Sequence, residues 1–126
     1  MKDGKYVILY VDDDQDMLDS IRTVLESAGY IMIEARSGEE GIKVYRENNP
    51  DFIIVDLMME EFDSGISLVK EINRAGVTAP VYMLSSVGDQ FDSLTDRSEL
   101  GLSGVFQKPI NVQVLLQTIK NHLHIS

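Results

Sequence analysis

Five short apolar runs divide the chain at similar intervals, and each is rich in β-branched or aromatic residues. Each run is too short for a helix, so we predict five β-strands. Three of the runs lack the polar alternation of half-exposed strands, which favours strands covered on both faces, as in a parallel sheet. The predicted strands cover residues 6–11, 30–34, 52–55, 81–84 and 105–106.

Helical patterns fill the gaps between these strands. In residues 18–28 the apolar side chains recur at steps of three and four, and Gly29 ends the pattern. Ser37 and Glu40 form a capping box that predicts a second helix, which ends before Pro50. Further helices are predicted at residues 66–72, at 89–100 and at 112–123. The helix at 89–100 is expected to be short or mobile, because Asp, Ser and Thr are frequent there.

Strands that alternate with helices through short connections predict right-handed crossovers and a doubly wound α/β sheet. A chain of 126 residues fits one domain of this kind. In such sheets ligands bind beyond the carboxyl ends of the strands, where the strand order reverses. Functional residues are therefore expected at that edge.

Composition excludes several functions. The net charge of −10, without a basic stretch, argues against direct binding to nucleic acid. The absence of cysteine excludes disulfides, thiolate zinc sites and a thiol nucleophile. The first residues lack a signal-peptide pattern, and no apolar run approaches the roughly 18 residues of a membrane span. We therefore expect a cytoplasmic protein that does not bind membranes.

Polar residues follow four of the predicted strands at their carboxyl ends. Asp12 and Asp13 follow the first strand, and Asp56 follows the third. Ser85 follows the fourth strand, and Lys108 lies just beyond the fifth. Because parallel strands end at the same edge, three carboxylates, a hydroxyl and an ammonium group are expected to converge there.

This combination of groups suits phosphoryl transfer assisted by a divalent cation. Clustered carboxylates suit Mg²⁺, which keeps several waters and leaves room for a phosphate. Asp56 lies between apolar residues, so it is the expected nucleophile and would form an aspartyl phosphate. Mg²⁺ and Lys108 would offset charge on the transferring phosphoryl group, and the Ser85 hydroxyl would donate to one of its oxygens.

Four segments, ILYVDDD, VDLMM, MLSS and FQKP, occur in this order at the strand ends. Together they resemble the receiver domain of two-component response regulators. The resemblance spans nearly the whole chain and implies a single receiver domain over residues 1–126. It also implies the flavodoxin-like (βα)5 fold, with a five-stranded parallel sheet in the order 2-1-3-4-5.

The resemblance assigns roles to the residues at the strand ends. Asp56 is implied as the phosphoacceptor, and Asp12 and Asp13 as the acidic pair. Mg²⁺ is expected on Asp13, Asp56 and the main-chain carbonyl of Met58, with Asp12 beside it. Ser85 is implied as the switch hydroxyl.

Lys108 is implied as the conserved-type lysine of the family, followed by a cis peptide bond to Pro109. The phosphoryl group would come from a phosphohistidine on a sensor histidine kinase or phosphotransfer protein, or from a small donor such as acetyl phosphate. The first helix would contact the kinase. The fourth helix, fifth strand and fifth helix would signal to an output domain or protein.

The implied protein is a phosphorelay switch rather than an enzyme, apart from self-phosphorylation and slow self-dephosphorylation. It is expected to be a monomer or a weak dimer that depends on phosphorylation. Met58 and Val87 would flank the attacking water, and neither side chain can hydrogen-bond to it. Slow loss of the phosphoryl group is therefore predicted.

Departures from the family pattern leave a second interpretation open. Val105 stands where an aromatic residue is usual, with Phe106 one place later. The loop of residues 59–65 lacks the usual proline. These departures would suit a degenerate receiver that binds partners without being phosphorylated.

Two further interpretations concern the acidic motifs. Asp14 and Asp16 suit a helix start, because acidic residues interact favourably with the amino end of a helix dipole. An aspartate-nucleophile phosphatase would need Asp-x-Asp-x-Thr/Val at the end of the first strand. When the motif starts at Asp12, its last position is Asp16 rather than Thr or Val. When it starts at Asp56, its third position is Met58 rather than Asp, so neither site fits it.

Overall fold

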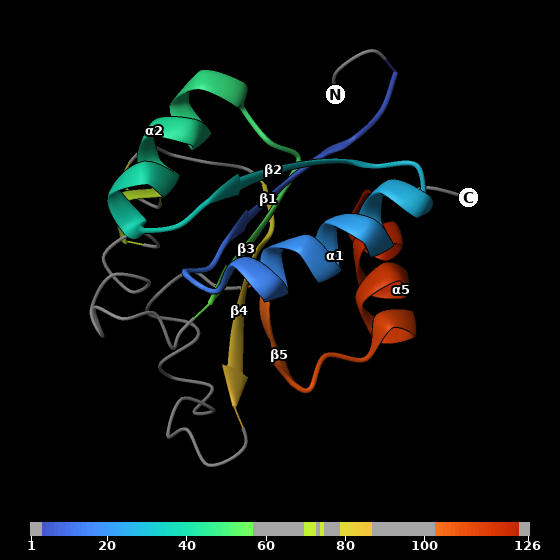
Figure 1. The fold of residues 1–126 in the computed structure, drawn as a ribbon. Helices are drawn as coiled ribbons and strands as arrows, with labels where there is room; N and C mark the ends of the chain where they lie inside the picture. The colour runs from blue at the N-terminus through green and yellow to red at the C-terminus, as the bar shows by residue number, and fades with distance from the viewer. Residues whose placement is uncertain (1–3, 57–69, 73, 75–78, 87–102, 124–126) are drawn as a thin grey trace.

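The computed structural model describes residues 4–56, 70–72, 74, 79–86 and 103–123, which form one five-stranded sheet with its covering helices. The order β2-β1-β3-β4-β5, with every neighbouring pair parallel, confirms the predicted topology (Figure 1). The strands are β1 (Val7–Val11), β2 (Ile31–Ala35), β3 (Phe52–Asp56), β4 (Val81–Ser86) and β5 (Gly104–Lys108).

The helices begin and end at residues suited to those positions. Their bounds are Gln15–Ser27 for α1, Gly38–Asn48 for α2 and Val112–Leu123 for α5. Asp14 caps α1 and Ser37 caps α2 by accepting hydrogen bonds from main-chain N–H groups. Residues 70–72, which belong to the third predicted helix, are helical, and so is residue 74. The predicted fourth helix lies outside the described residues. No helix in the described ranges is long and apolar enough to cross a bilayer.

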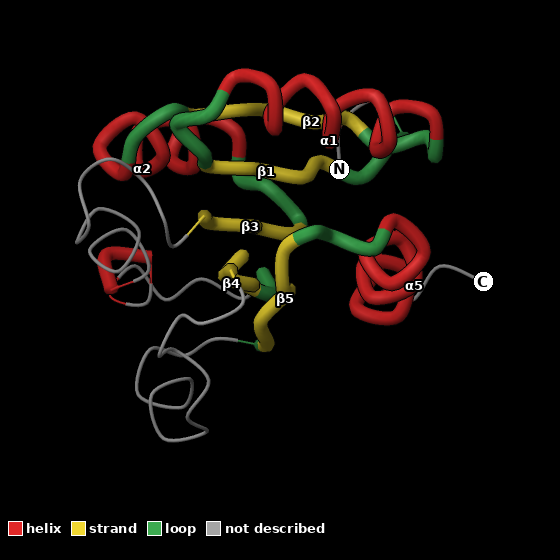
Figure 2. The backbone as a smooth tube through the Cα atoms, turned by 60° about the horizontal axis from the view of Figure 1, so that its bottom comes forward, coloured by secondary structure: helices red, strands yellow, loops and turns green. Residues whose placement is uncertain are grey.

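Helices cover both faces of the sheet, which is therefore doubly wound as predicted (Figure 2). α2 packs on one face, where Ile42, Val44 and Tyr45 contact the buried cluster. α1 and α5 pack on the other face. Their buried side chains are Leu18, Ile21, Leu25, Leu115 and Ile119.

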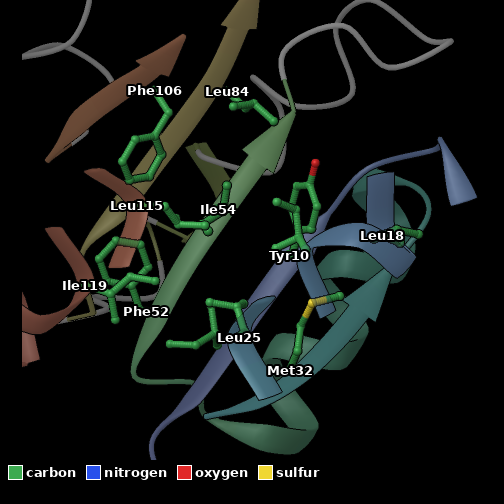
Figure 3. Packing of buried hydrophobic residues seen from close by; sticks show 12 residues of the cluster. Tyr10, Leu18, Leu25, Met32, Phe52, Ile54, Leu84, Phe106, Leu115 and Ile119 are labelled. Atoms are coloured by element: carbon green, nitrogen blue, oxygen red, sulfur yellow. The ribbon is translucent and has the colours of Figure 1, made fainter. Parts of the chain in front are cut away.

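Alternate residues of the central strands serve the two cores. In β1, Ile8 and Tyr10 belong to the cluster with α1 and α5, which Figure 3 shows from close by. Leu9 and Val11 belong to the cluster on the α2 face. All residues of β1 and β3 are buried, which explains why their sequences lack polar alternation.

Val105 and Phe106 lie on opposite faces of β5. Val105 packs against the cluster on the α2 face, whereas Phe106 is buried with α1 and α5. The Phe106 ring stacks on Tyr82 with 4.7 Å between centroids, and Tyr82 stacks on Phe52 at 5.3 Å. The Tyr82 hydroxyl and Nε2 of His122 are hydrogen-bonded at 2.8 Å. Phe106 is therefore a core residue and does not replace the aromatic side chain missing at Val105.

β5 is longer than the two residues predicted for it. It pairs with β4 over five residues, from Gly104 beside Tyr82 to Lys108 beside Ser86. Because β5 is an edge strand, it carries the exposed Gln107, which interrupts the apolar pattern. Glycine is favoured at its start, since a Cβ atom at Gly104 would lie 2.6 Å from Cε2 of Tyr82.

Candidate functional site

The carboxyl ends of β1 and β3 bring three aspartates together. The two strands pair in parallel with Val11 beside Val55, so the next residues, Asp12 and Asp56, lie next to each other. Asp13 follows in the loop before α1. Carboxylate oxygens of Asp12, Asp13 and Asp56 lie within 4.8 Å of one another. The acidic residues predicted from the sequence thus form one cluster.

An ion pair joins β3 to β5 across the intervening β4. The Nζ atom of Lys108 lies 3.1 Å from Oδ1 of Asp56. The Asp56 side chain is 3% exposed and that of Lys108 is 26% exposed. A carboxylate withdrawn from water needs such a cation, because burial of an isolated charge is costly. The peptide bond between Lys108 and Pro109 is cis, as predicted.

Asp12 is fully buried and hydrogen-bonded on both carboxylate oxygens. The Tyr10 hydroxyl donates to Oδ2, and the main-chain N–H of Asp14 donates to Oδ1 at 2.9 Å. Burial raises the pKa of Asp12 to about 6; the charge of Asp56 adds to this rise, while the two hydrogen bonds oppose it. Burial, followed by the contact with Asp12, raises the pKa of Tyr10. The charged form of Asp12 would therefore gain from a nearby cation.

The acidic run after β1 divides between the site and the start of α1. Oδ1 of Asp14 accepts hydrogen bonds from the N–H groups of Asp16 at 3.0 Å and Met17 at 3.5 Å. Asp16 lies in the first turn of α1, where its charge interacts favourably with the helix dipole. Asp14 and Asp16 thus belong to the helix start, as expected, while Asp12 and Asp13 belong to the cluster.

Ser85 is buried near the carboxyl end of β4, with 4% of its surface exposed. β4 lies between β3 and β5, so Ser85 stands between the strands whose ends form the ion pair. The predicted carbonyl ligand Met58, the predicted shielding residue Val87 and the loop 59–65 lie outside the described residues. Their roles stay predictions.

The donor set fits a hard divalent cation. The cluster offers only carboxylate oxygens, from Asp12, Asp13 and Asp56, and such ligands suit Mg²⁺ better than zinc or copper. When all four groups are ionised, the three carboxylates and the Lys108 ammonium have a net charge of −2. One divalent cation neutralises that excess.

Arg36 also lies at this edge of the sheet, and it is not among the predicted site residues. It directly follows β2, so the rule that points to the other strand ends applies to it as well. Its Nη2 atom donates to the main-chain oxygen of Asp13 at 3.3 Å. All five strands therefore end in or next to a polar or charged residue at this edge.

Comparison with known proteins matches residues 8–120 to the response regulator receiver domain. The chemotaxis protein CheY of Bacillus subtilis is 31% identical over 118 residues, which cover 93% of this chain and 97% of CheY. The alkaline phosphatase synthesis transcriptional regulatory protein PhoP of Bacillus subtilis is 31% identical over 113 residues. These cover 90% of this chain and 46% of PhoP, so the chain spans about half the length of that relative.

Solved structures agree with these sequence matches. A response regulator receiver domain protein from Clostridium thermocellum superposes with a TM-score of 0.84 at 29% identity, over 94% of both chains. A two-component response regulator from Clostridium difficile gives a TM-score of 0.84 at 25% identity, over 96% of this chain and 98% of that one. With its flavodoxin-like strand order and its ordered strand-end motifs, the chain belongs to the response regulator receiver domain family of two-component signalling systems.

Proposed function

We propose that residues 1–126 form one receiver domain that accepts a phosphoryl group on Asp56 in a Mg²⁺-dependent reaction. The ion pair between Asp56 and Lys108, beside Asp12 and Asp13, carries this proposal. This arrangement of four side chains combines a buried nucleophile, a cation for the phosphoryl oxygens and a set of metal ligands. A receiver of this kind acts as a signalling switch and not as a turnover enzyme.

In the proposed step, a carboxylate oxygen of Asp56 attacks the phosphorus atom of the donor. The bond from phosphorus to the leaving nitrogen or oxygen breaks, and its electron pair departs with that atom. Asp56 becomes an acyl phosphate, and the donor loses its phosphoryl group. The Lys108 ammonium, which pairs with Asp56 beforehand, would then offset negative charge on the phosphoryl oxygens.

Asp12, Asp13 and Asp56 would hold the metal, together with the main-chain carbonyl predicted at Met58. Bound Mg²⁺ would supply charge neutralisation for the phosphoryl oxygens and for the carboxylates. The hydrogen bonds from Tyr10 and from the N–H of Asp14 would keep the Asp12 carboxylate oriented in its buried position.

Ser85 would convert phosphorylation into a conformational change. Its hydroxyl would donate to a phosphoryl oxygen and draw the end of β4 toward Asp56. The change would alter the surface made by the fourth helix, β5 and α5, which would contact the output. Val105 is small, so this switch would depend on the hydroxyl rather than on the rotation of a ring.

The phosphoryl donor would be a phosphohistidine on a sensor kinase or phosphotransfer protein, or acetyl phosphate, in the cytoplasm. α1 would contact the kinase, and the domain would be a monomer or a weak phosphorylation-dependent dimer. Both an attached output domain and a separate output protein are compatible with the relatives: PhoP is longer than this chain, and CheY has a similar length. Because the net charge is −10, contact with DNA would belong to another domain or chain.

Beryllofluoride, which mimics a phosphoryl group on a carboxylate, tests this proposal without a kinase. Fluorine NMR should show a bound signal for the wild type with Mg²⁺, and no bound signal for Asp56→Asn or with EDTA. A wild type that gives no bound signal at saturating Mg²⁺ would favour the phosphorylation-independent interaction module.

A further inference from the structure

Arg36 occupies the one strand end to which the proposed transfer gives no role. β2 pairs with β1 so that Ala35 lies beside Val11, and the Asp12 N–H donates to the Ala35 oxygen at 3.0 Å. Arg36 is the next residue, so its main chain lies alongside the acidic loop that follows β1. The Nη2 contact with the Asp13 oxygen at 3.3 Å places the guanidinium over that loop.

The guanidinium of Arg36 differs from the other described arginines in its partners. Arg22, Arg46 and Arg74 each form ion pairs with glutamates, at distances up to 3.7 Å. Within the described ranges no carboxylate forms an ion pair with the Arg36 guanidinium, which donates to a neutral carbonyl instead. The Glu40 carboxylate accepts from the main-chain N–H of Arg36, at 3.3 Å, and not from its side chain. Arg36 is exposed, so most of its N–H donors face water and remain available to a ligand.

The negative charge of the site would repel an anionic donor, and the exposed Arg36 guanidinium can offset that repulsion. A phosphoryl donor is an anion and must approach three clustered carboxylates. The Lys108 ammonium is only 26% exposed and already pairs with Asp56, which leaves it little capacity to attract a ligand from solution. A guanidinium group has the planar donor geometry that matches phosphate oxygens, and it keeps its charge at all relevant pH values.

We propose that Arg36 binds the anionic phosphoryl donor at the rim of the site before transfer. The inference rests on the proposed phosphoacceptor function of Asp56 and assigns a further residue to it. Arg36 is a donor-binding residue in this account, and it makes and breaks no covalent bond. Its contribution should grow with the negative charge of the donor and shrink as salt screens the charges.

Self-phosphorylation kinetics over a range of acetyl phosphate concentrations, at saturating Mg²⁺, test this inference. The Arg36→Ala variant should need about tenfold more acetyl phosphate for half-saturation, equal to about 1.4 kcal/mol of binding. Its limiting rate should stay within about twofold, because the lost binding is equal in the ground state and the transition state. Arg36→Lys should recover part of the loss, because it restores the charge but not the planar fork.

Lys120→Ala is a matched control, because it removes one exposed positive charge at the other end of the sheet, near Gly4–Tyr6 before β1. It should leave half-saturation within about twofold of wild type, since the charges there are screened from the site.

The charge of the donor and the salt concentration give two further tests. With monoanionic phosphoramidate as donor, the loss in Arg36→Ala should be smaller than with dianionic acetyl phosphate. About 1 M NaCl should reduce the difference between wild type and Arg36→Ala.

Three outcomes would overturn the inference. One is unchanged half-saturation in Arg36→Ala, and another is an equal loss in Lys120→Ala. The third is a loss explained by weaker Mg²⁺ binding, which would show that Arg36 acts through Asp13; a separate Mg²⁺ titration detects it. A wild type that takes up no phosphoryl group would overturn the proposed function and this inference together, whereas a labelled wild type with an unaffected Arg36→Ala would overturn this inference alone.

Discussion

Lys108 and Asp56 form an ion pair of 3.1 Å that links β5 to β3 over the end of β4. The nucleophile of the proposed reaction is therefore already paired, in the folded chain, with the cation that would offset negative charge on the phosphoryl oxygens. The pair also makes the burial of the Asp56 carboxylate tolerable. Chemistry and stability are thus coupled at the same two side chains.

Replacing Lys108 by Ala should slow phosphorylation by about 10²–10³-fold, the usual effect of removing one group that stabilises developing charge. The free energy of unfolding should fall by about 1 kcal/mol, less than for a fully buried pair because Lys108 is partly exposed. Initial rates with acetyl phosphate and urea unfolding measure the two effects. Lys120→Ala serves as the control, and a Lys108→Ala rate close to wild type would contradict the assigned role.

The raised pKa of Asp12 predicts how stability depends on pH in the metal-free protein. The folded-state pKa of about 6 lies above the ordinary value of 3.8, so the folded chain retains a proton that the unfolded chain has already released. The resulting stabilisation is complete below about pH 4 and is lost as pH rises through about 6. It amounts to about 2–3 kcal/mol at most.

Asp12→Asn isolates this effect, because the amide does not titrate. Unfolding free energies in EDTA, measured from pH 4 to pH 7, should fall more steeply for the wild type than for Asp12→Asn. Mg²⁺ affinity of the wild type should also drop below about pH 6, where protons compete for the ligands. Parallel stability profiles of the two proteins would be inconsistent with a raised pKa at Asp12.

Gly104→Ala should destabilise the fold without touching the site. A Cβ atom there would lie 2.6 Å from Cε2 of Tyr82, whose ring is held between Phe52 and Phe106. We expect a loss of about 1–3 kcal/mol by thermal or urea unfolding, typical of overpacking. Ser103→Ala, at the exposed neighbouring position, should stay within about 0.5 kcal/mol of wild type.

A second change tests the cause of that loss. Tyr82→Leu removes the ring that the new methyl group would meet, so Gly104→Ala should cost much less in a Tyr82→Leu background than in the wild type. Additive losses in the double variant would show that the contact with Tyr82 is not responsible.

Phosphorylated protein should lose its phosphoryl group slowly, over minutes or longer. Met58 and Val87 are predicted to flank the attacking water, and neither can hold it by a hydrogen bond. Phosphate release after removal of acetyl phosphate measures the rate, and Met58→Asn should accelerate it. A wild-type lifetime of only seconds would refute the predicted shielding.

Much of the site could be predicted because parallel strands end at one edge. Once the runs ending at Asp12 and Asp56 are recognised as neighbouring strands, their carboxylates must lie close together. The division of the acidic run also followed from local physics, since Asp14 stands where a helix cap is required. Arg36 obeys the same strand-end rule, and the polar cluster alone gave no reason to look beyond the other four strands.

Other features depend on contacts that local patterns do not contain. The face on which Phe106 lies is fixed by the register of β5 against β4. The partner of His122 is Tyr82, forty positions away in the sequence, so the place of this histidine in an aromatic cluster depends on a contact between distant segments. The predicted fifth strand was too short because the polar Gln107 interrupts the apolar pattern. An edge strand such as β5 tolerates such an exposed residue.

Intact-mass spectrometry after incubation with acetyl phosphate is the most direct test of Asp56 as phosphoacceptor. With Mg²⁺, the wild type should gain about 80 Da from one covalently attached phosphoryl group. Asp56→Asn should gain nothing, and neither should the wild type in EDTA. Equal labelling of Asp56→Asn, or a wild type that stays unmodified at saturating Mg²⁺ and donor, would contradict the account.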